Sequence, residues 1–394
     1  MKITRIDAFA VRIPRDLARA TGTAGSPALL MPAANDYRRA VSYPALYSVN
    51  IETALVCVHT DSGLTGWGEA QAPLAPQVAC SIIDLLLRPV LLGFEFDATP
   101  TGIEAVWNRM YAAMRVRGQT GGFMLDAISG IDLALWDLAG QAQKLPVSRL
   151  MAGESAKNRV CSYVSGLNGD SDAARIETAK HFVTEGYRVF KIYCDRPLGE
   201  IIGTLDALRE ALGSEVSIAV DALWRLTAED ALPFGRMLDE RNALWLECPF
   251  MPEEINAHVD LAHCIRTPIA LGESYRTRYE LAPFFEKRAV RVVQPDLGRC
   301  GITQGLQIAR IAHGLGLTIV PHVSIALGPQ IAAAIHFASA VPDCDLLEFN
   351  PVVLEAANRY LEKPLVVQNG HYIVPDLPGL GVDFAQAPPG VFLP

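Results

Sequence analysis

Six polar residues close short, β-rich runs at nearly equal intervals in the second half of the chain. They are Asp221, Glu247, Glu273, Asp296, His322 and Glu348. Subtracting consecutive residue numbers gives steps of 26, 26, 23, 26 and 26, each about the length of one strand plus one helix. One such residue alone could be an ordinary helix N-cap. Six in register favour a single functional rim, because the carboxyl ends of parallel barrel strands meet at one face.

The first three residues of this series are carboxylates on consecutive predicted strands: Asp221, Glu247 and Glu273. Three acids in a rim of low dielectric constant repel one another unless a cation lies among them. Oxygen ligands without His or Cys favour a hard ion. We therefore predict one Mg²⁺ per subunit at these residues, with Mn²⁺ as an alternative, and open positions for water or a substrate carboxylate.

Asp296 and His322 lie on the next two predicted strands. A carboxylate paired with an imidazole orients the ring and raises its pKa, which suits a general acid or base. A purely structural His–Asp pair is the alternative.

Lys191 and Tyr193 lie two residues apart in the run "YRVFKIYCD". Residues at i and i+2 of a strand point to the same side, so an amine and a phenol share one face just before the metal strands. An ammonium beside acids and a bound anion is electrostatically sensible. For Tyr193 the roles of acid, hydrogen-bond donor and activated base all stay open, as does simple packing, because a phenol with a pKa near 10 is a poor base at pH 7.

The elements that position these residues follow a strand–helix rhythm that begins near residue 157. Eight β-rich runs alternate with helical stretches such as "DAARIETAKHFVTEG", which predicts a closed parallel (β/α) barrel. An open doubly wound sheet is the alternative, but no GxGxxG motif follows the early strands. Before the barrel, "ITRIDAFAVRI" and "TALVCVHTDSGLTGWGEA" predict antiparallel strands, and residues 75–150 have a helical pattern. Residues 15–46 show no clear periodicity and predict a long loop.

Composition narrows the class of partner. The chain has 394 residues, a formal net charge of −9 and eight scattered cysteines without CxxC spacing. This balance argues against nucleic acid and anionic membranes as partners, and no stretch is long and apolar enough for a bilayer. The N-terminus alternates apolar and polar residues, unlike a signal peptide. We therefore expect a cytoplasmic protein with free thiols.

Taken together, the motifs resemble the enolase superfamily, and within it the mandelate racemase group. The similarity rests on "GWGEA", "AISGIDLALWDLAGQAQKLPV", "VQPDLGRCG", "VPH" and "PDLPGLGVDF", which span nearly the whole chain. The resemblance implies an α/β fold: a modified TIM (β/α) barrel with an α+β capping domain formed by the N-terminal segment and the C-terminal tail. We place the capping domain at 1–128, the barrel at 129–350 and the returning tail at 351–394.

The same resemblance implies roles for the rim residues. Asp221, Glu247 and Glu273 match the Mg²⁺ ligands, Asp296 and His322 the catalytic dyad, and Glu348 an acid that hydrogen-bonds the enediolate. It also implies a homo-oligomer, either a dimer or an octamer. The shared step is removal of a proton α to a metal-bound carboxylate.

The sequence departs from the family pattern at the second barrel strand. The group usually has Lys-x-Lys there, whereas this chain has Lys191, Ile192 and Tyr193, as some acid-sugar dehydratases do. Cys248 follows Glu247 where a second acid is common, Leu223 replaces a frequent polar residue, and "RCGIT" has one Gly where the family often has two.

These features favour a Mg²⁺-dependent dehydratase acting on a sugar acid or related 2,3-dihydroxy acid, with a small carboxylate as the binding partner. Racemisation or epimerisation at the α-carbon is the alternative, and it needs a competent base on both faces. Muconate-type cycloisomerisation fits less well, and a metal-binding homologue without activity is a further alternative. Specificity is expected from residues 15–46, whose candidates are Arg15, Tyr37, Arg38, Arg39 and Tyr43, and from the adjacent Tyr47.

Overall fold

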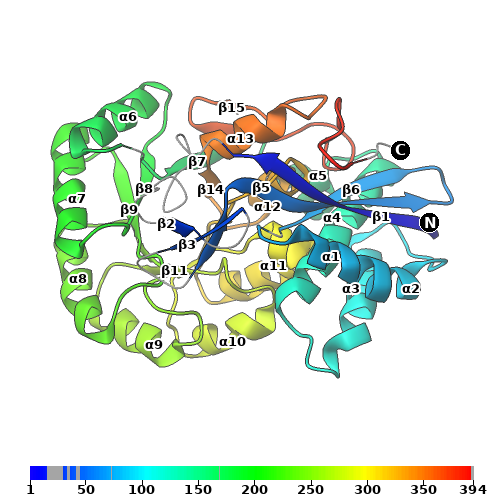
Figure 1. Cartoon of the computed structure of the whole chain (residues 1–394), viewed down its shortest axis with the longest axis horizontal. Helices are drawn as coiled ribbons and strands as arrows, with labels where there is room; N and C mark the ends of the chain where they lie inside the picture. Colours follow the sequence, from blue (N-terminus) through cyan, green and yellow to red (C-terminus); the bar gives the residue numbers. More distant parts are fainter. Residues whose placement is uncertain (16–29, 33–35, 41–44, 72, 168, 392–394) are drawn as a thin grey trace.

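A barrel and a capping domain lie side by side in the computed structural model, with both ends of the chain on the capping side (Figure 1). The structure describes residues 1–391 except 16–29, 33–35, 41–44, 72 and 168. Within these residues, no helix combines the length and the apolar character needed to cross a membrane.

The capping domain is built on a three-stranded antiparallel sheet of β1 (Ile3–Pro14), β5 (Asn50–Thr60) and β6 (Thr65–Ala70). The predicted hairpin around "TDSGLTG" is confirmed, because β5 and β6 pair on either side of it. Helix α4 (Gly122–Gln143) packs against β6 so closely that a Cβ at Gly68 would overlap the Gly130 carbonyl. Three further helices pack against α4: α1 (Pro76–Ile82), η3 (Ile83–Leu87) and α3 (Pro100–Arg115). The short helix α2 (Arg88–Leu91) packs against η3 and α3.

The prediction of an irregular loop over residues 15–46 is wrong in part. Its described part contains β2 (Leu30–Pro32), β3 (Tyr37–Ala40) and β4 (Leu46–Ser48), which pair as a small antiparallel sheet. Strands of three or four residues are too short to show an alternating pattern. Ala40 and Tyr47 from this sheet pack against Leu223 and Tyr193 of the barrel, so it lies against the barrel's upper face.

The barrel prediction is confirmed, and the open-sheet alternative is wrong. The parallel strands run in the order β13-β12-β11-β10-β9-β8-β7, and β14 pairs with the free side of β7. Between β14 and β13 the ring is joined by single backbone hydrogen bonds, such as the one from the Ile319 N–H to the Asp343 carbonyl (3.0 Å). The strands are β7 (Arg159–Ser165), β8 (Val189–Tyr193), β9 (Ser217–Asp221), β10 (Leu246–Glu247), β11 (Ile269–Leu271), β12 (Val292–Val293), β13 (Thr318–Ile319) and β14 (Leu346–Phe349).

One helix follows each of these strands and forms the outer layer (Figure 1). The helices are α6 (Asp172–Thr184), α7 (Leu198–Leu212), α8 (Ala228–Glu240), α9 (Ile255–Cys264), α10 (Arg278–Glu286), α11 (Leu297–Gly314), α12 (Pro329–Ala340) and α13 (Pro351–Asn358). Two short turns of helix, α5 (Val147–Ala152) and η4 (Gly153–Ser155), connect α4 to the barrel.

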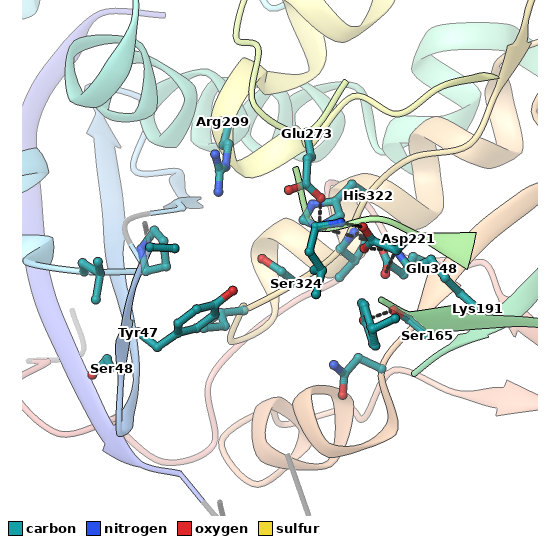
Figure 2. Close-up of a pocket in the computed structure, with 18 of the residues that line it drawn as sticks. Tyr47, Ser48, Ser165, Lys191, Asp221, Glu273, Arg299, His322, Ser324 and Glu348 are labelled. Carbon is teal, nitrogen blue, oxygen red and sulfur yellow. Dashed lines mark hydrogen bonds and ion pairs between the residues drawn. The ribbon is translucent and has the colours of Figure 1, made fainter. Parts of the chain in front are cut away.

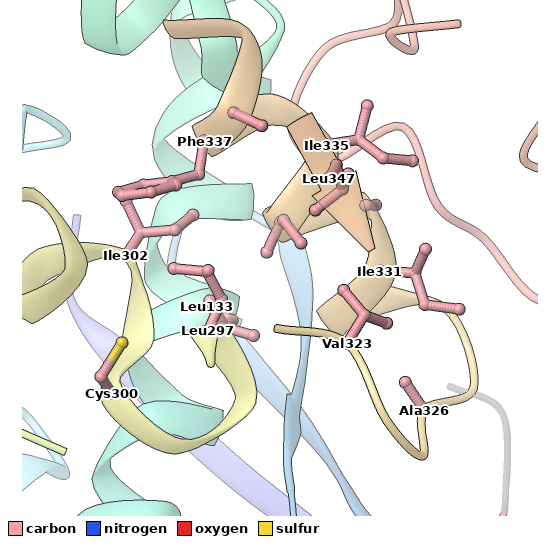
Figure 3. Close-up of a cluster of buried hydrophobic side chains, with 14 of the residues drawn as sticks. Leu133, Leu297, Cys300, Ile302, Val323, Ala326, Ile331, Ile335, Phe337 and Leu347 are labelled. Carbon is pink, nitrogen blue, oxygen red and sulfur yellow. The ribbon is translucent and has the colours of Figure 1, made fainter. Parts of the chain in front are cut away.

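A continuous apolar core joins the barrel to the capping domain. Figure 3 shows Leu133 of α4 close to Leu297 and Ile302 of α11, with Phe337 of α12 beside them. All four side chains are fully buried. Asp132 of α4 also accepts a hydrogen bond from the Thr303 N–H of α11 (2.9 Å). The predicted boundary at 128/129 lies within α4, which belongs to both layers, so the division at that residue stays a prediction.

The C-terminal tail contacts both units. Its β16 (His371–Ile373) pairs with β7 of the barrel and with β15 (Val367–Gln368). Farther on, Phe384 packs against Trp67 of the capping sheet with ring centroids 4.9 Å apart.

Buried His336 joins α12 to the tail in a way that requires a neutral imidazole. The Ser148 N–H donates to Nδ1 (3.3 Å), and Nε2 donates to the Leu380 carbonyl (3.1 Å). Burial lowers the pKa of His336 to about 4. An unfolded histidine titrates near 6.5, so the stabilisation is complete above pH 6.5 and is lost as the pH falls towards 4.

We therefore expect His336 to account for about 3 kcal/mol of the loss in unfolding free energy between pH 6.5 and 4. His336→Gln should be less stable at pH 7 but should lose less stability on acidification, as measured by urea unfolding at several pH values. The control is His263→Gln at an exposed position on α9, which should leave the pH dependence of the unfolding free energy as in wild type. A parallel pH dependence in His336→Gln and wild type would contradict this assignment.

Candidate active site

A cavity of about 300 Å³ opens at the carboxyl ends of the barrel strands, where the β3–β4 hairpin meets them. Most of the predicted residues line it: Lys191, Tyr193, Asp221, Glu273, His322 and Glu348. Figure 2 shows the acids, His322 and Lys191 gathered on one side, with Tyr47 and Arg299 on the other. Glu247 and Asp296 lie directly behind this wall, fully buried, and contact Lys191 and His322.

The buried ammonium of Lys191 lies among three of the acids. Its Nζ is 2.5 Å from Glu247, 3.1 Å from Glu348 and 3.6 Å from Asp221. Burial lowers the pKa of Lys191, but the charges of Glu247 and Glu348 outweigh burial and raise it well above its ordinary value. Lys191 is therefore held as a cation at neutral pH.

Parallel pairing of β9 with β10 sets Glu247 directly beside Asp221. Oε2 of Glu247 accepts hydrogen bonds from Trp245 Nε1 (2.9 Å) and Gln294 Nε2 (2.7 Å), which fix the carboxylate. Asp221 Oδ1 accepts from the Leu223 N–H (2.9 Å). Left-handed backbone follows both strands, at Leu223 (φ 54°), Trp224 (φ 55°) and Cys248 (φ 44°). Such strained conformations are uncommon and cluster at functional sites.

The acids suit a hard divalent cation in donor type and charge. Burial raises the pKa of Asp221, the neighbouring Glu247 raises it further, and Lys191 compensates only in part. A cation among these acids would relieve that excess of negative charge. Within the described part of the chain, no three acid, His or Cys side chains are arranged to hold an ion as they stand. Glu247 contacts Lys191 and Glu273 contacts His322 instead, so an ion would compete with these contacts.

His322 lies between two acids. Its Nδ1 is 2.6 Å from Asp296 Oδ2, and its Nε2 is 2.8 Å from Glu273 Oε2. Asp296 also caps α11 by accepting from the Gly298 N–H (2.9 Å), and Gln330 donates to the same oxygen (3.0 Å). Asp296 therefore has two functions: it is the acid partner of His322 and the N-cap of α11.

The charge around His322 favours the imidazolium. Burial lowers the pKa of His322, but the charges of Glu273 and Glu348 and the Asp296 hydrogen bond together raise it well above its ordinary value. Glu348 connects the two sides of the cluster: Oε1 faces Lys191 (3.1 Å), and Oε2 accepts from the Val323 N–H (2.9 Å) at the His322 side.

Tyr193 faces the cavity beside Lys191, as the i, i+2 spacing predicted. Its hydroxyl is 2.7 Å from Ser165 Oγ at the end of β7. Burial raises the pKa of Tyr193, the charges of Glu348 and Asp221 raise it further, and Lys191 and Ser165 oppose this. In the protein alone the side chain is therefore a neutral phenol at pH 7.

Only some of the residues predicted to set substrate specificity line the cavity. Arg15 and Tyr47 line the cavity, whereas Tyr37 hydrogen-bonds Glu52 (3.3 Å) and Arg39 is exposed. Arg38 donates to the Tyr37 carbonyl (2.9 Å). Tyr43 lies outside the described residues.

Several residues that line the cavity or support its lining were not identified from the sequence. Trp245 and Gln294 each stand two residues before a rim acid, so the period of two could have indicated them. Arg299 could not have been found that way. Its Nε donates to Gln71 of the capping domain, whose amide donates to Ser324 and whose backbone N–H donates to the Gly298 carbonyl (2.8 Å). Residues 71 and 299 are 228 positions apart, so only the fold brings them together.

Family models match most of the chain. Residues 43–152 match the mandelate racemase/muconate lactonizing enzyme N-terminal domain, and residues 174–387 match the enolase C-terminal domain-like family. The chain belongs to the mandelate racemase/muconate lactonizing enzyme group of the enolase superfamily. The family prediction and the capped-barrel fold are thereby confirmed.

Curated relatives of this chain include both lyases and isomerases. The chain is 31% identical to arabinonate dehydratase of Saccharolobus solfataricus, over 88% of this chain and 92% of the relative. It is also 31% identical to D-galactarolactone cycloisomerase of Agrobacterium fabrum, over 84% of this chain and 88% of the relative.

Two solved structures show the same fold over nearly the whole chain. One is a member of the enolase superfamily from Agrobacterium tumefaciens, with a TM-score of 0.89, 29% identity and coverage of 98% of this chain and 97% of that one. The other, from Bordetella bronchiseptica RB50 in complex with 2-oxoglutarate/phosphate, has a TM-score of 0.83, 29% identity and coverage of 98% and 96%.

Proposed function

We propose that the protein is a Mg²⁺-dependent dehydratase of a sugar acid or related 2,3-dihydroxy carboxylic acid. The observation that carries this proposal is the Asp296–His322 pair, held beside a cluster of acids in one cavity with the lysine and the phenol of β8. The dehydratase relative and the small carboxylate bound to the Bordetella structure support the substrate class.

His322 is the proposed proton-transfer residue. Asp296 holds Nδ1, which leaves Nε2 on the side of Glu273 and the cavity. Neutral His322 would remove the α-proton, or the imidazolium would protonate the departing β-hydroxyl. Because the pKa of His322 is raised, the second task is the easier one in the protein alone.

Asp221, Glu247 and Glu273 would hold Mg²⁺ together. When bound, the ion polarises the substrate carboxylate and stabilises the negative charge that builds up on it. Lys191 would lose part of its contact with Glu247 and could then donate to a substrate oxygen. Glu348 lines the same cavity beside Lys191 and could accept a hydrogen bond from a substrate hydroxyl.

Tyr193 has the proposed role of a neutral donor. Its raised pKa disfavours a phenolate, and Ser165 fixes the hydroxyl at 2.7 Å. A site with one strong proton-transfer residue suits dehydration better than racemisation, which needs a base on each face of the α-carbon.

Isomerisation is the second candidate, favoured by the cycloisomerase relative and by a proton-bearing group, Tyr193, on a different strand from His322. An inactive metal-binding homologue is a third. The cytoplasmic location and an assembly as dimer or octamer stay predictions.

Product analysis tests the proposed function. Incubation of the Mg²⁺-loaded protein with a library of aldonates and aldarates should yield a 2-keto-3-deoxy acid from at least one of them. An epimer or a lactone as the sole product would establish isomerisation instead. Absence of both product and solvent deuterium at the α-carbon, across the library, would favour the inactive homologue.

Removal of the β10 carboxylate should weaken metal binding. Glu247→Gln keeps the size of the side chain but removes one charge and one acceptor oxygen, so we expect at least a tenfold loss in Mg²⁺ affinity by calorimetry, an order-of-magnitude expectation. Activity should disappear while the circular dichroism spectrum is retained. The control is Glu240→Gln on the exposed end of α8, which should bind Mg²⁺ as wild type does. Unchanged affinity in Glu247→Gln would remove this residue from the proposed ligand set.

Tyr193→Phe separates proton transfer from packing, because the ring is kept. Loss of an acid contribution predicts a fall of roughly 10² to 10⁴ in kcat, whereas packing alone predicts kinetics within a few-fold of wild type. A phenolate base would instead give wild-type activity that rises with pH through an ionisation absent from the variant. Exposed Tyr279→Phe is the matched control. A Tyr193→Phe variant close to wild type would leave His322 as the single proton-transfer residue.

A further inference from the structure

The basic residues that line the cavity differ in whether they have acidic or polar partners within the protein. Lys191 contacts three acids and His322 contacts Asp296 and Glu273. Arg299 donates its Nε to Gln71 and lies near Glu273, whose pKa its charge helps to lower. Arg15 differs from all of these. Its guanidinium makes no hydrogen bond or ion pair with any residue that the structure describes.

The backbone of Arg15 is fixed by the capping sheet. The residue directly follows β1, and its N–H donates to the Val49 carbonyl (3.2 Å). From there the side chain lines the cavity, where the phenols of Tyr47 and Tyr193 lie near it. Burial lowers the pKa of Arg15, and the phenols of Tyr193 and Tyr47 offset that effect only in part, with no contribution from a carboxylate among the described residues. A partly buried arginine without a carboxylate is unfavourable by itself and is suited to an anion supplied from outside.

We propose that Arg15 binds a second carboxylate of the substrate, at the end distant from the α-carbon. The substrate would then be a dicarboxylic sugar acid rather than an aldonate with a neutral terminal hydroxyl. This inference rests on the proposed function and deepens it.

The arrangement of the cavity supports a ligand charged at both ends. His322 and the acid cluster line one part of it. Arg15 lines the cavity too, but its charge acts on Tyr47 and Tyr193 and not on Asp221, Glu273 or Glu348. The α-carbon must lie near His322 for proton transfer. A chain reaching from His322 towards Arg15 would place its far end against the guanidinium, with the Tyr47 and Ser48 side of the cavity beside it. A guanidinium pairs with a carboxylate through two parallel hydrogen bonds.

A matched pair of ligands tests the proposal. An aldonate and the aldarate of the same chain length and configuration differ only in the terminal group, and a 6-phosphoaldonate tests whether phosphate is preferred. Binding to the Mg²⁺-loaded protein would be measured by calorimetry, and turnover by product formation. Wild type should favour the aldarate over the aldonate by about 10- to 100-fold, the usual contribution of a charge-assisted hydrogen bond.

Arg15→Gln should raise Kd and KM for the aldarate by a similar factor, with kcat within a few-fold of wild type. Its constants for the aldonate should be unchanged. Arg15→Lys should recover part of the affinity. Arg5→Gln, on the exposed side of the strand that precedes Arg15, is the control because Arg5 pairs with Asp7 at the surface.

The outcomes separate this proposal from the proposed function. Arg15-dependent binding of the aldarate without turnover would support the second carboxylate and contradict the dehydratase. Turnover of aldonate and aldarate with equal efficiency, insensitive to Arg15→Gln, would overturn the role of Arg15 and leave the dehydratase standing. Preference for the 6-phosphoaldonate would overturn the dicarboxylate. Failure of wild type to bind any of these acids would overturn both.

Discussion

The buried charge of Lys191 is the constraint on which the catalytic side of the cavity depends. An ammonium taken out of water costs several kcal/mol unless carboxylates surround it, and here Glu247, Glu348 and Asp221 do so. The acids need the lysine equally, because carboxylates on neighbouring strands repel one another. Trp245 and Gln294 then fix Glu247 from behind, so its position does not depend on the cation alone. Any ion or substrate that enters must therefore redistribute an existing charge balance.

The barrel makes this balance possible through its register. β8, β9 and β10 are adjacent and parallel, and Tyr193, Asp221 and Glu247 pair side by side across them. Left-handed backbone at Leu223 and Cys248 ends two of these strands abruptly, so the chain turns away immediately after each acid. Such backbone conformations are unfavourable and persist only when the surrounding structure stabilises them. Here a continuous apolar core runs from α4 into α11 and α12 (Figure 3).

The sequence was sufficient for features that repeat. The steps of 23 to 26 residues predicted both the barrel and its rim, because a closed parallel barrel converts a regular spacing in sequence into a ring in space. The i, i+2 relation of Lys191 and Tyr193 predicted a shared face for the same reason. The sequence was insufficient to predict contacts between segments that are far apart in the chain. Arg299 meets Gln71 across the two domains, and the β2–β4 sheet consists of strands too short to show a period. Arg15 was recognised as one of several candidates, but only the structure separates it from Tyr37 and Arg39.

The cavity is lined by residues from two sources, the barrel and the capping domain, and this division helps to explain how one fold can serve several reactions. Proton-transfer residues lie at strand ends, where pairing with neighbours fixes them within a rigid barrel. Arg15 and Tyr47 instead come from the capping domain, next to segments whose strands are short. Changes in those segments can alter the Arg15 and Tyr47 side of the cavity, while the hydrogen bond of the Asp296–His322 pair is made within the barrel. Two contacts do link the capping domain to the catalytic side. Glu69 of β6 accepts from the N–H of Gln330, whose side chain donates to Asp296. Arg299 follows Asp296 by three residues and is oriented by Gln71 of the capping domain. Through the Arg299–Gln71 contact, a change in the capping domain can reach the electrostatics of Glu273, and through Glu273 the proton affinity of His322.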